Sequence, residues 1–204
     1  MTLHPLTRTL EQCCLNAWPA LRRQALDGWE LRFGDGFTRR ANSVQSLRAG
    51  SQDAEARLSR AEGAYTAVGQ PTVFKVTPLA QPAGLDALLE ARGYRREGET
   101  SVQLLEPLRP HARDPAVTLD DPLADEWLSA FTRLDATPLQ HQRALRAILA
   151  CIAPPHTAAL LREGGAVASC GRAVLEGEQV GLFDIATDPA LHRRGCAGRL
   201  IGHL

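Results

Sequence analysis

The sequence predicts an α/β protein in which a mixed, mostly antiparallel sheet is flanked by helices, in two parts joined by a linker. Three observations predict this fold class. Helix-like and strand-like segments alternate over the first hundred residues, a proline-rich segment follows, and the rest has the pattern of two helices, three strands and a loop rich in arginine and glycine. With 204 residues, 44% of them hydrophobic, the chain is long enough for one large or two small domains with a real core.

The first hundred residues are predicted to form seven elements. Apolar residues recur at helical spacing over 6–26, where Pro19 breaks or kinks the helix. Residues 29–33 alternate as a strand does, and Gly34-Asp35-Gly36 predicts a hairpin turn. The remaining elements are a return strand over 37–47, a helix over 53–68, a strand over 72–77, a helix over 83–92 that ends at Gly93, and a strand over 94–105.

Residues 106–116 form the predicted linker, because three prolines lie within them. The predicted first part is therefore 1–105 and the second part is 117–204. Asp121-Pro122 is a helix-start signal in the second part. The elements predicted from there are helices over 122–134 and from Thr137-Pro138 to Ala153, then strands over 157–162, 166–175 and 179–187, joined by glycine-containing hairpin turns.

The stretch from Asp184 to Ile201, DIATDPALHRRGCAGRLI, is the most informative part of the chain. A strand ends at Thr187-Asp188-Pro189, and a loop rich in arginine and glycine leads into a helix. Glycine lets backbone N–H groups come close to an anion, and the start of a helix adds unpaired N–H donors and the positive end of its dipole. Together these features predict a site that holds a diphosphate, the alternative being an ordinary surface turn before a helix.

This stretch resembles the acyl-CoA loop of the GNAT N-acetyltransferase family. The family pattern is Arg or Gln, two residues, Gly, one residue, then Gly or Ala, and here His192, Gly195 and Ala197 take those places. His192 departs from the pattern, because an imidazole is charged only below a pKa near 6.5. Arg193 and Arg194 can compensate for the missing charge. The order of two helices, three strands and the loop is also that of the N-terminal half of the family's domain.

The resemblance implies transfer of an acetyl group from acetyl-CoA, as co-substrate, to an amine of a small molecule or a protein. It implies that backbone N–H groups near 185–187 polarise the thioester carbonyl and that the loop holds the diphosphate. A non-catalytic acyl-CoA-binding or interaction protein is the main alternative, and a nucleotide-binding module is a weaker one, because no Walker lysine follows the glycines. The implied cofactor-binding residues are Ile185, Ala186, Thr187, His192, Arg193, Arg194, Gly195, Cys196, Ala197 and Gly198.

Asp184 is the candidate catalytic residue, as the base that takes a proton from the attacking amine. We expect it to share a strand face with the apolar Val180, Leu182 and Ala186. The alternative is a carboxylate that caps a loop or pairs with an arginine. For Cys196, a buried packing role is the alternative to a reactive thiol beside a helix N-terminus.

The first part resembles a degenerate acetyltransferase-like domain without the CoA loop, most closely in the segment LLEARGYRREGE. The alternative is an unrelated α/β module. The second part resembles a domain of the family that is incomplete at its C-terminus, since the sequence ends at Leu204 within the helix after the loop. We therefore expect the strand over 179–187 to be covered, either by strands of the first part, by a second subunit in a homodimer, or by further residues.

Composition argues against several other classes of protein. The chain has 23 basic and 23 acidic residues, so it lacks the basic excess of a nucleic-acid-binding domain. Its five cysteines are odd in number and form no C-x-x-C motif, which argues against a disulfide framework or a metal site. No apolar stretch is long enough for a signal peptide or a membrane span, and a cytoplasmic protein without membrane contact is expected.

Overall fold

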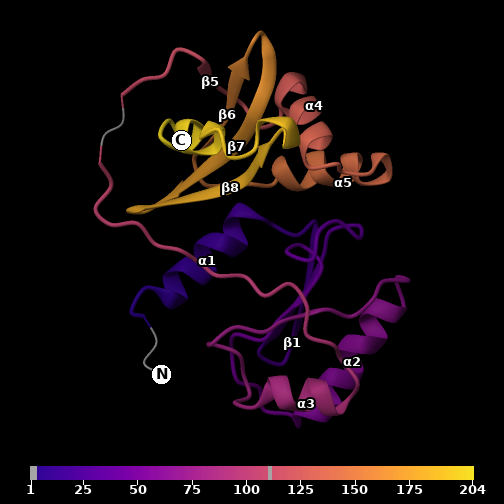
Figure 1. Ribbon diagram of the computed structural model, residues 1–204. Helices are drawn as coiled ribbons and strands as arrows, with labels where there is room; N and C mark the ends of the chain where they lie inside the picture. The colour runs from indigo at the N-terminus through magenta and orange to yellow at the C-terminus, as the bar shows by residue number, and fades with distance from the viewer. Residues whose placement is uncertain (1–3, 110–111) are drawn as a thin grey trace. The chain divides into compact units, whose positions relative to one another are not determined.

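The computed structural model describes residues 4–109 and 112–204, which form two compact units. Of these residues, unit 1 contains His4 and 20–108, and unit 2 contains 5–19, 109 and 112–204. Helix α1 (Thr7–Ala17) therefore belongs to unit 2, whereas the sequence analysis assigned it to the first part. The reason is a long-range contact, since the amide of Asn16 donates to both carboxylate oxygens of Glu176, at 2.8 and 2.9 Å. Figure 1 shows α1 beside strand β8 (Gln179–Thr187).

Unit 1 is a four-stranded sheet with two helices. Its strands are β1 (Arg22–Leu26), β2 (Trp29–Phe33), β3 (Val44–Gln45) and β4 (Phe74–Lys75), in that spatial order, and only the β3–β4 pair is parallel. The helices are α2 (Ala54–Thr66) and α3 (Leu85–Ala91). One face of the sheet and the apolar sides of both helices form the core, which includes Trp29, Leu31, Val44, Leu58, Tyr65 and Leu85.

Three predictions for unit 1 are wrong. Residues 22–26 form β1 and not a helix, because the Asp27-Gly28 turn pairs them with β2 in a hairpin. The expected strand over 37–47 shrinks to β3, because the side chain of Asn42 holds the preceding residues in a loop. Its Oδ1 accepts from the N–H groups of Gly34 and Gly36, at 2.7 and 3.2 Å.

The third wrong prediction is the strand over 94–105, which the structure does not contain. Residues 95–105 are exposed, so neither face of this segment has a core to pack against. Strand-like residue preference stabilises a strand only where a partner strand and a buried face are present. The helices α2 and α3 were predicted at nearly their observed positions, and Gly93 has the left-handed backbone (φ 88°) expected of a helix-terminating glycine.

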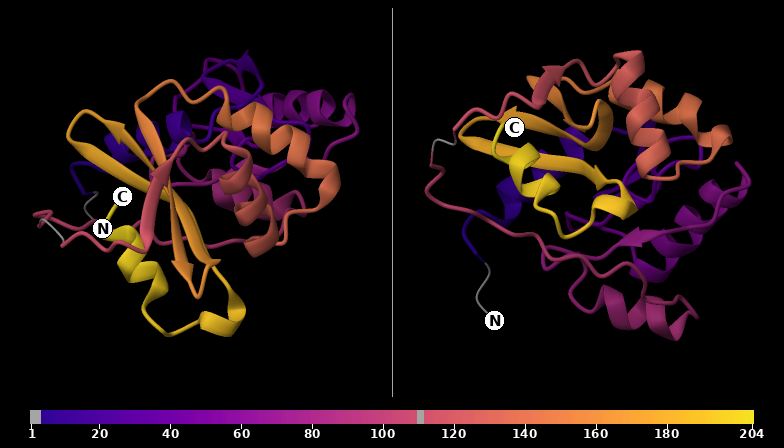
Figure 2. Two further views of the ribbon diagram at one scale, coloured as in Figure 1. Left: turned by 90° about the horizontal axis from the view of Figure 1, so that it is seen from above. Right: turned by 45° about the horizontal axis from the view of Figure 1, so that its top comes forward.

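Unit 2 is an antiparallel sheet with helices on both faces. The strands are β5 (Val117–Asp120), β6 (His156–Glu163), β7 (Ala166–Glu176) and β8, in that spatial order. Helices α4 (Asp125–Leu134) and α5 (Leu139–Leu149) lie on one face, and α6 (Cys196–Ile201) lies on the other (Figure 2). A short 3-10 helix, η1 (Pro189–Leu191), follows β8. Strands β6, β7 and β8 were predicted from the sequence, whereas β5 was not.

Each unit has a sheet of its own, so the expectation that strands of the first part complete the second sheet is wrong for the described residues. Strand β8 is an edge strand of its sheet. Within residues 4–109 and 112–204, none of the helices has the length and apolar character needed to span a membrane.

Candidate functional site

Strand β8 contains a β-bulge at the position where the expected site begins. In its ladder with β7, Arg172 pairs with Phe183 and Cys170 pairs with Ala186, so Asp184 and Ile185 both lie opposite Gly171. Asp184 has a φ of 56°, in the left-handed region that aspartate tolerates better than most residues. The bulge interrupts the regular pairing of β8 just before Ala186 and Thr187.

The carboxylate of Asp184 forms a buried ion pair with Arg172, whose Nε donates to Oδ2. Both side chains are almost fully buried, with exposed fractions of 3% for Asp184 and 0% for Arg172. The structure therefore shows the alternative in which Asp184 pairs with an arginine. Its action as a base stays a prediction.

The expectation that Asp184 shares a face with Val180 and Leu182 is wrong. Those two side chains are exposed, at 39% and 40%, whereas the carboxylate is buried. The extra residue in the bulge shifts the alternation of side chains along β8, so Asp184 turns toward Arg172.

Gly171 lacks a side chain that would clash with the bulged strand. A Cβ on this residue would lie 2.3 Å from Cδ1 of Ile185 and 3.1 Å from Cδ2 of Leu200, on the face that carries α6. The Gly171 carbonyl accepts a hydrogen bond from the indole N–H of Trp127, at 3.1 Å. A glycine here lets Ile185 pack under α6 while α4 holds the backbone from the other face.

Ser169 fixes the end of β8. Its Oγ lies 2.8 Å from the carbonyl oxygen of Ala186 and 2.9 Å from Oγ1 of Thr187. Because a carbonyl oxygen can only accept, Ser169 donates to Ala186 and the Thr187 hydroxyl donates to Ser169. The orientation of the expected carbonyl-polarising segment is therefore set by β7.

The loop after β8 is held closed by its own residues. The Asp188 side chain accepts from the N–H of Ala190 at 2.9 Å, and Nε2 of His192 lies 3.0 Å from the carbonyl oxygen of Thr187. Since that oxygen only accepts, Nε2 carries the proton and donates it to the loop. A neutral His192 then has no second N–H for a phosphate, and its expected role as a phosphate donor stays a prediction.

Helix α6 begins with Gly195 in a left-handed conformation (φ 79°). The N–H of Arg199 donates to the Gly195 carbonyl at 3.0 Å, so the N–H groups of residues 196–198 precede the first helical hydrogen bond. Apart from chain neighbours and the backbone of α6, no atom of residues 4–109 and 112–204 lies within 4 Å of where a Cβ on Gly195 or Gly198 would be. Arg193 and Arg194 are exposed. At the start of α6 the chain thus offers accessible backbone N–H groups beside two positively charged side chains.

The side chain of Cys196 packs in the core and does not face the loop. It is buried with Leu200, Ala159 and Leu161 between α6 and the sheet. The packing alternative for this cysteine is therefore observed. Its backbone N–H remains among those at the start of α6.

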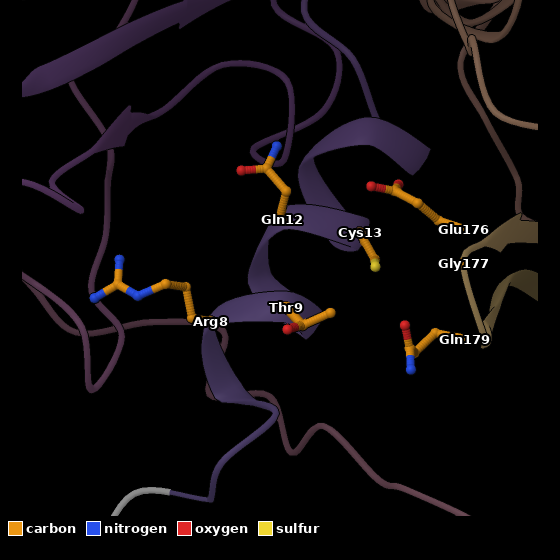
Figure 3. Close-up of a pocket in the computed structure, with 7 residues that line it drawn as sticks. All are labelled: Arg8, Thr9, Gln12, Cys13, Glu176, Gly177 and Gln179. Atoms are coloured by element: carbon orange, nitrogen blue, oxygen red, sulfur yellow. The ribbon is translucent and has the colours of Figure 1, made fainter.

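A separate hollow of about 400 Å³ lies in unit 2 between α1 and the turn that joins β7 to β8 (Figure 3). Burial, and then the nearby Glu176, raise the pKa of the Cys13 thiol in this hollow, so it stays protonated at neutral pH. None of the residues expected from the sequence to form the site lines it. Its lining residues are Arg8, Thr9, Gln12, Cys13, Glu176, Gly177 and Gln179.

Sequence reasoning missed Arg172, the partner of Asp184. A signal was present, because Arg172 is the one charged residue between Ala166 and Leu175, in a run of small, apolar and uncharged residues. A buried charge requires a partner, and the hairpin turn at Gly177 sets a register that brings Arg172 next to Asp184. Two tryptophans near this pair gave no comparable signal: Trp18, whose ring centroid lies 5.0 Å from the central guanidinium carbon of Arg172, and Trp127, which donates to Gly171.

Comparison with known proteins supports the expected relationship. The model of a family described as "Probable histone acetyltransferase Rv0428c C-terminal" matches residues 6–204. The uncharacterized N-acetyltransferase YobR of Bacillus subtilis (strain 168) is 34% identical over 92 residues, which are 45% of this chain and 36% of that protein. The match thus spans about a third of the length of this curated relative.

A solved structure shows the same fold. The GCN5-related N-acetyltransferase from Kribbella flavida superposes with a TM-score of 0.62 at 15% sequence identity, covering 99% of this chain and 80% of that one. This likeness confirms the predicted mixed α/β fold with antiparallel sheets flanked by helices. Because the family model covers nearly the whole chain, the protein belongs to the family of that description, and its fold is that of a GNAT N-acetyltransferase.

Proposed function

We propose that this protein transfers an acetyl group from acetyl-CoA to an amine, with its site along 184–198. The observation that carries the proposal is the continuity of one segment: a bulge in an edge strand, a closed loop with two exposed arginines, and a helix that starts at a left-handed glycine. Family membership supports the same activity.

The residues of this segment suit acetyl-CoA. A diphosphate would be held by the N–H groups of residues 196–198 and by Arg193 and Arg194, and the open space at Gly195 and Gly198 leaves room for its approach. When bound, acetyl-CoA supplies the acetyl thioester. The backbone N–H groups of 185–187 would then donate to its carbonyl, because these residues lie at and directly after the bulge of an edge strand.

The acceptor in this proposal is an amine of a small molecule or of a protein. The description of the matching family names a histone acetyltransferase, which makes lysine peptides reasonable members of an acceptor panel. The attacking amine must be unprotonated, and Asp184 or water would take its proton. The tandem origin of the two units, the homodimer and the cytoplasmic location stay predictions.

Calorimetry with acetyl-CoA, CoA and ATP, followed by a thiol-release assay with an amine and peptide panel, tests the proposal. We expect the two CoA species to bind and ATP not to bind, and thiol release to require an amine. Binding without turnover would favour the non-catalytic acyl-CoA-binding alternative. Binding of none of the three would contradict the assignment of the loop.

The loop itself is tested by Gly195→Ala. We expect acetyl-CoA affinity to fall at least about tenfold, because a Cβ would occupy the space open to the phosphates and disfavour the left-handed backbone. Gly177→Ala in the β7–β8 turn is the matched control, since Gly177 is also left-handed (φ 61°) but lies outside the loop. Equal affinity of the Gly195 variant and wild type would show that the diphosphate binds elsewhere.

A further inference from the structure

We propose that Arg172 is a positioning residue, and that its ion pair with Asp184 holds the β8 bulge in the geometry that the acetyl carbonyl requires. The inference rests on the proposed function and assigns Asp184 a structural task in place of proton transfer. It concerns five side chains that surround the bulge: Trp18, Trp127, Arg172, Phe183 and Asp184.

The first argument is the conformation of Asp184. A residue with a side chain at φ 56° persists where surrounding contacts determine the backbone. One such contact is the hydrogen bond from Arg172 Nε to the carboxylate, across the two strands. Because Arg172 sits beside the interrupted pairs of the ladder, its side chain ties the bulged residue back to β7.

The second argument is that the guanidinium of Arg172 is itself fixed. Its central carbon lies 5.0 Å from the ring centroids of both Trp18, at the end of α1, and Phe183, on β8. Cation–π contacts of this length orient a guanidinium and stabilise its charge in a buried place. Trp127 adds a third constraint by donating to Gly171, the residue opposite the bulge. The bulge is thus held from α1, from α4 and from within the sheet.

The third argument concerns what Asp184 can do chemically. Its carboxylate is buried and accepts a hydrogen bond from the Arg172 Nε. An incoming amine would have to compete with the Arg172 Nε for it. A carboxylate held in this way is better suited to fixing the backbone of 185–187 than to exchanging a proton at every turnover.

A neutral replacement of the pair distinguishes the two roles. Arg172→Gln and Asp184→Asn each leave one buried charge without its counter-ion, and we expect each to lower kcat roughly 10²-fold through displacement of the bulge. The double variant places two amides that can hydrogen-bond to each other, and asparagine tolerates a positive φ. We expect it to recover kcat to within about tenfold of wild type. A base at Asp184 predicts the opposite, since the double variant has no carboxylate.

Arg172→Lys covers the case in which the neutral pair does not fold. It retains Asp184 and a positive charge but loses the planar group that Trp18 and Phe183 hold. Positioning predicts a lower kcat and faster amide exchange over 183–187 by mass spectrometry. The matched control is Arg162→Lys, on β6 of the same sheet, where the arginine forms a solvent-accessible ion pair with Glu126 of α4. Its kcat and exchange should stay at wild-type values.

Two results would overturn the inference. One is a folded double variant that is as inactive as Asp184→Asn, and the other is Arg172→Lys with wild-type kcat and exchange. Neither result would contradict the proposed function, because that proposal is tested by acetyl-CoA binding and turnover of the wild-type protein. Wild-type protein without acetyl-CoA turnover would instead overturn the proposed function, and this inference with it.

Discussion

At the scale of single residues, two aspartates with positive φ use their carboxylates to hold a turn of the backbone. Asp184 does so through Arg172. Asp27, with a φ of 39°, joins the β1–β2 turn to the segment before α2. Its Oδ1 accepts from the N–H of Ser51 at 3.0 Å, and its Oδ2 accepts from the N–H of Gln52 at 2.7 Å. In both places the aspartate combines tolerance of a left-handed backbone with two acceptor oxygens.

Asp27 should make the stability of unit 1 depend on acidic pH. The N–H groups of Ser51 and Gln52 hold the pKa of Asp27 below its ordinary value of 3.8. A carboxyl with a lowered pKa stabilises the fold above its unfolded pKa, and this contribution is lost as the pH falls through its folded pKa. We therefore expect the Tm of unit 1 to fall below pH 3.8, and Asp27→Asn to weaken this fall while lowering the Tm at neutral pH.

Thermal unfolding of the wild-type protein and of Asp27→Asn at a series of acidic pH values measures this dependence. Asp35→Asn is the matched control, because Asp35 also has a positive φ (53°) and its carboxylate forms no hydrogen bond to other residues of 4–109 and 112–204. An Asp27→Asn variant with the acid dependence of wild type would show that these hydrogen bonds do not contribute to it.

At the scale of elements, the sequence predicts those whose boundaries are set locally. Strands β6, β7 and β8 were found to within a residue or two, because glycine turns separate their alternating segments. The prediction for 22–26 was wrong although its partner strand is close by, across the Asp27-Gly28 turn. The predictions for 37–47 and 94–105 were wrong because the state of these segments depends on the side chain of Asn42 and on the presence of a partner strand and a buried face. Local pattern does not contain that information.

The candidate site divides in the same way. The loop over 192–198 could be predicted, since its glycine spacing and the following helix are local features. The bulge could not, because it exists only in the pairing of β7 with β8, where Gly171 accommodates Ile185. The ion pair of Arg172 with Asp184 depends on the same register of β7 and β8. From the sequence, pairing of Asp184 with an arginine was only one of two alternatives.

The fit between Gly171 and Ile185 gives a prediction at this scale. Gly171→Ala should destabilise unit 2 by about 1–3 kcal/mol, because its new Cβ would overlap Cδ1 of Ile185. Ile185→Val removes that methyl group and should alone cost about 0.5–1.5 kcal/mol. The double variant should lose less free energy of unfolding than the sum of the two single losses, by at least about 0.5 kcal/mol. Urea unfolding of the four proteins measures the coupling, and strictly additive costs would contradict the proposed overlap.

At the scale of the whole molecule, unit 2 is discontinuous in sequence. Helix α1 and residues 109–204 fold together, and unit 1 lies between them in the chain. Asn16 and Glu176 are hydrogen-bonded although 160 positions separate them. Such contacts form only after a long loop has closed, so we expect α1 to dock late in folding. Through Trp18 it also reaches the Arg172 pair.

Deletion of residues 1–19 should therefore weaken unit 2 while leaving unit 1 intact. Without α1, Glu176 loses the amide of Asn16 and Arg172 loses the ring of Trp18, so amide exchange should accelerate over β7 and β8. Exchange over α2, in unit 1, should not change and serves as the internal control, and deletion of residues 1–4 alone is the matched variant. A synthetic peptide of residues 5–19 added in trans should restore protection of β7 and β8. If the long deletion instead accelerates exchange in α2 and leaves the β7–β8 hairpin protected, α1 does not stabilise unit 2.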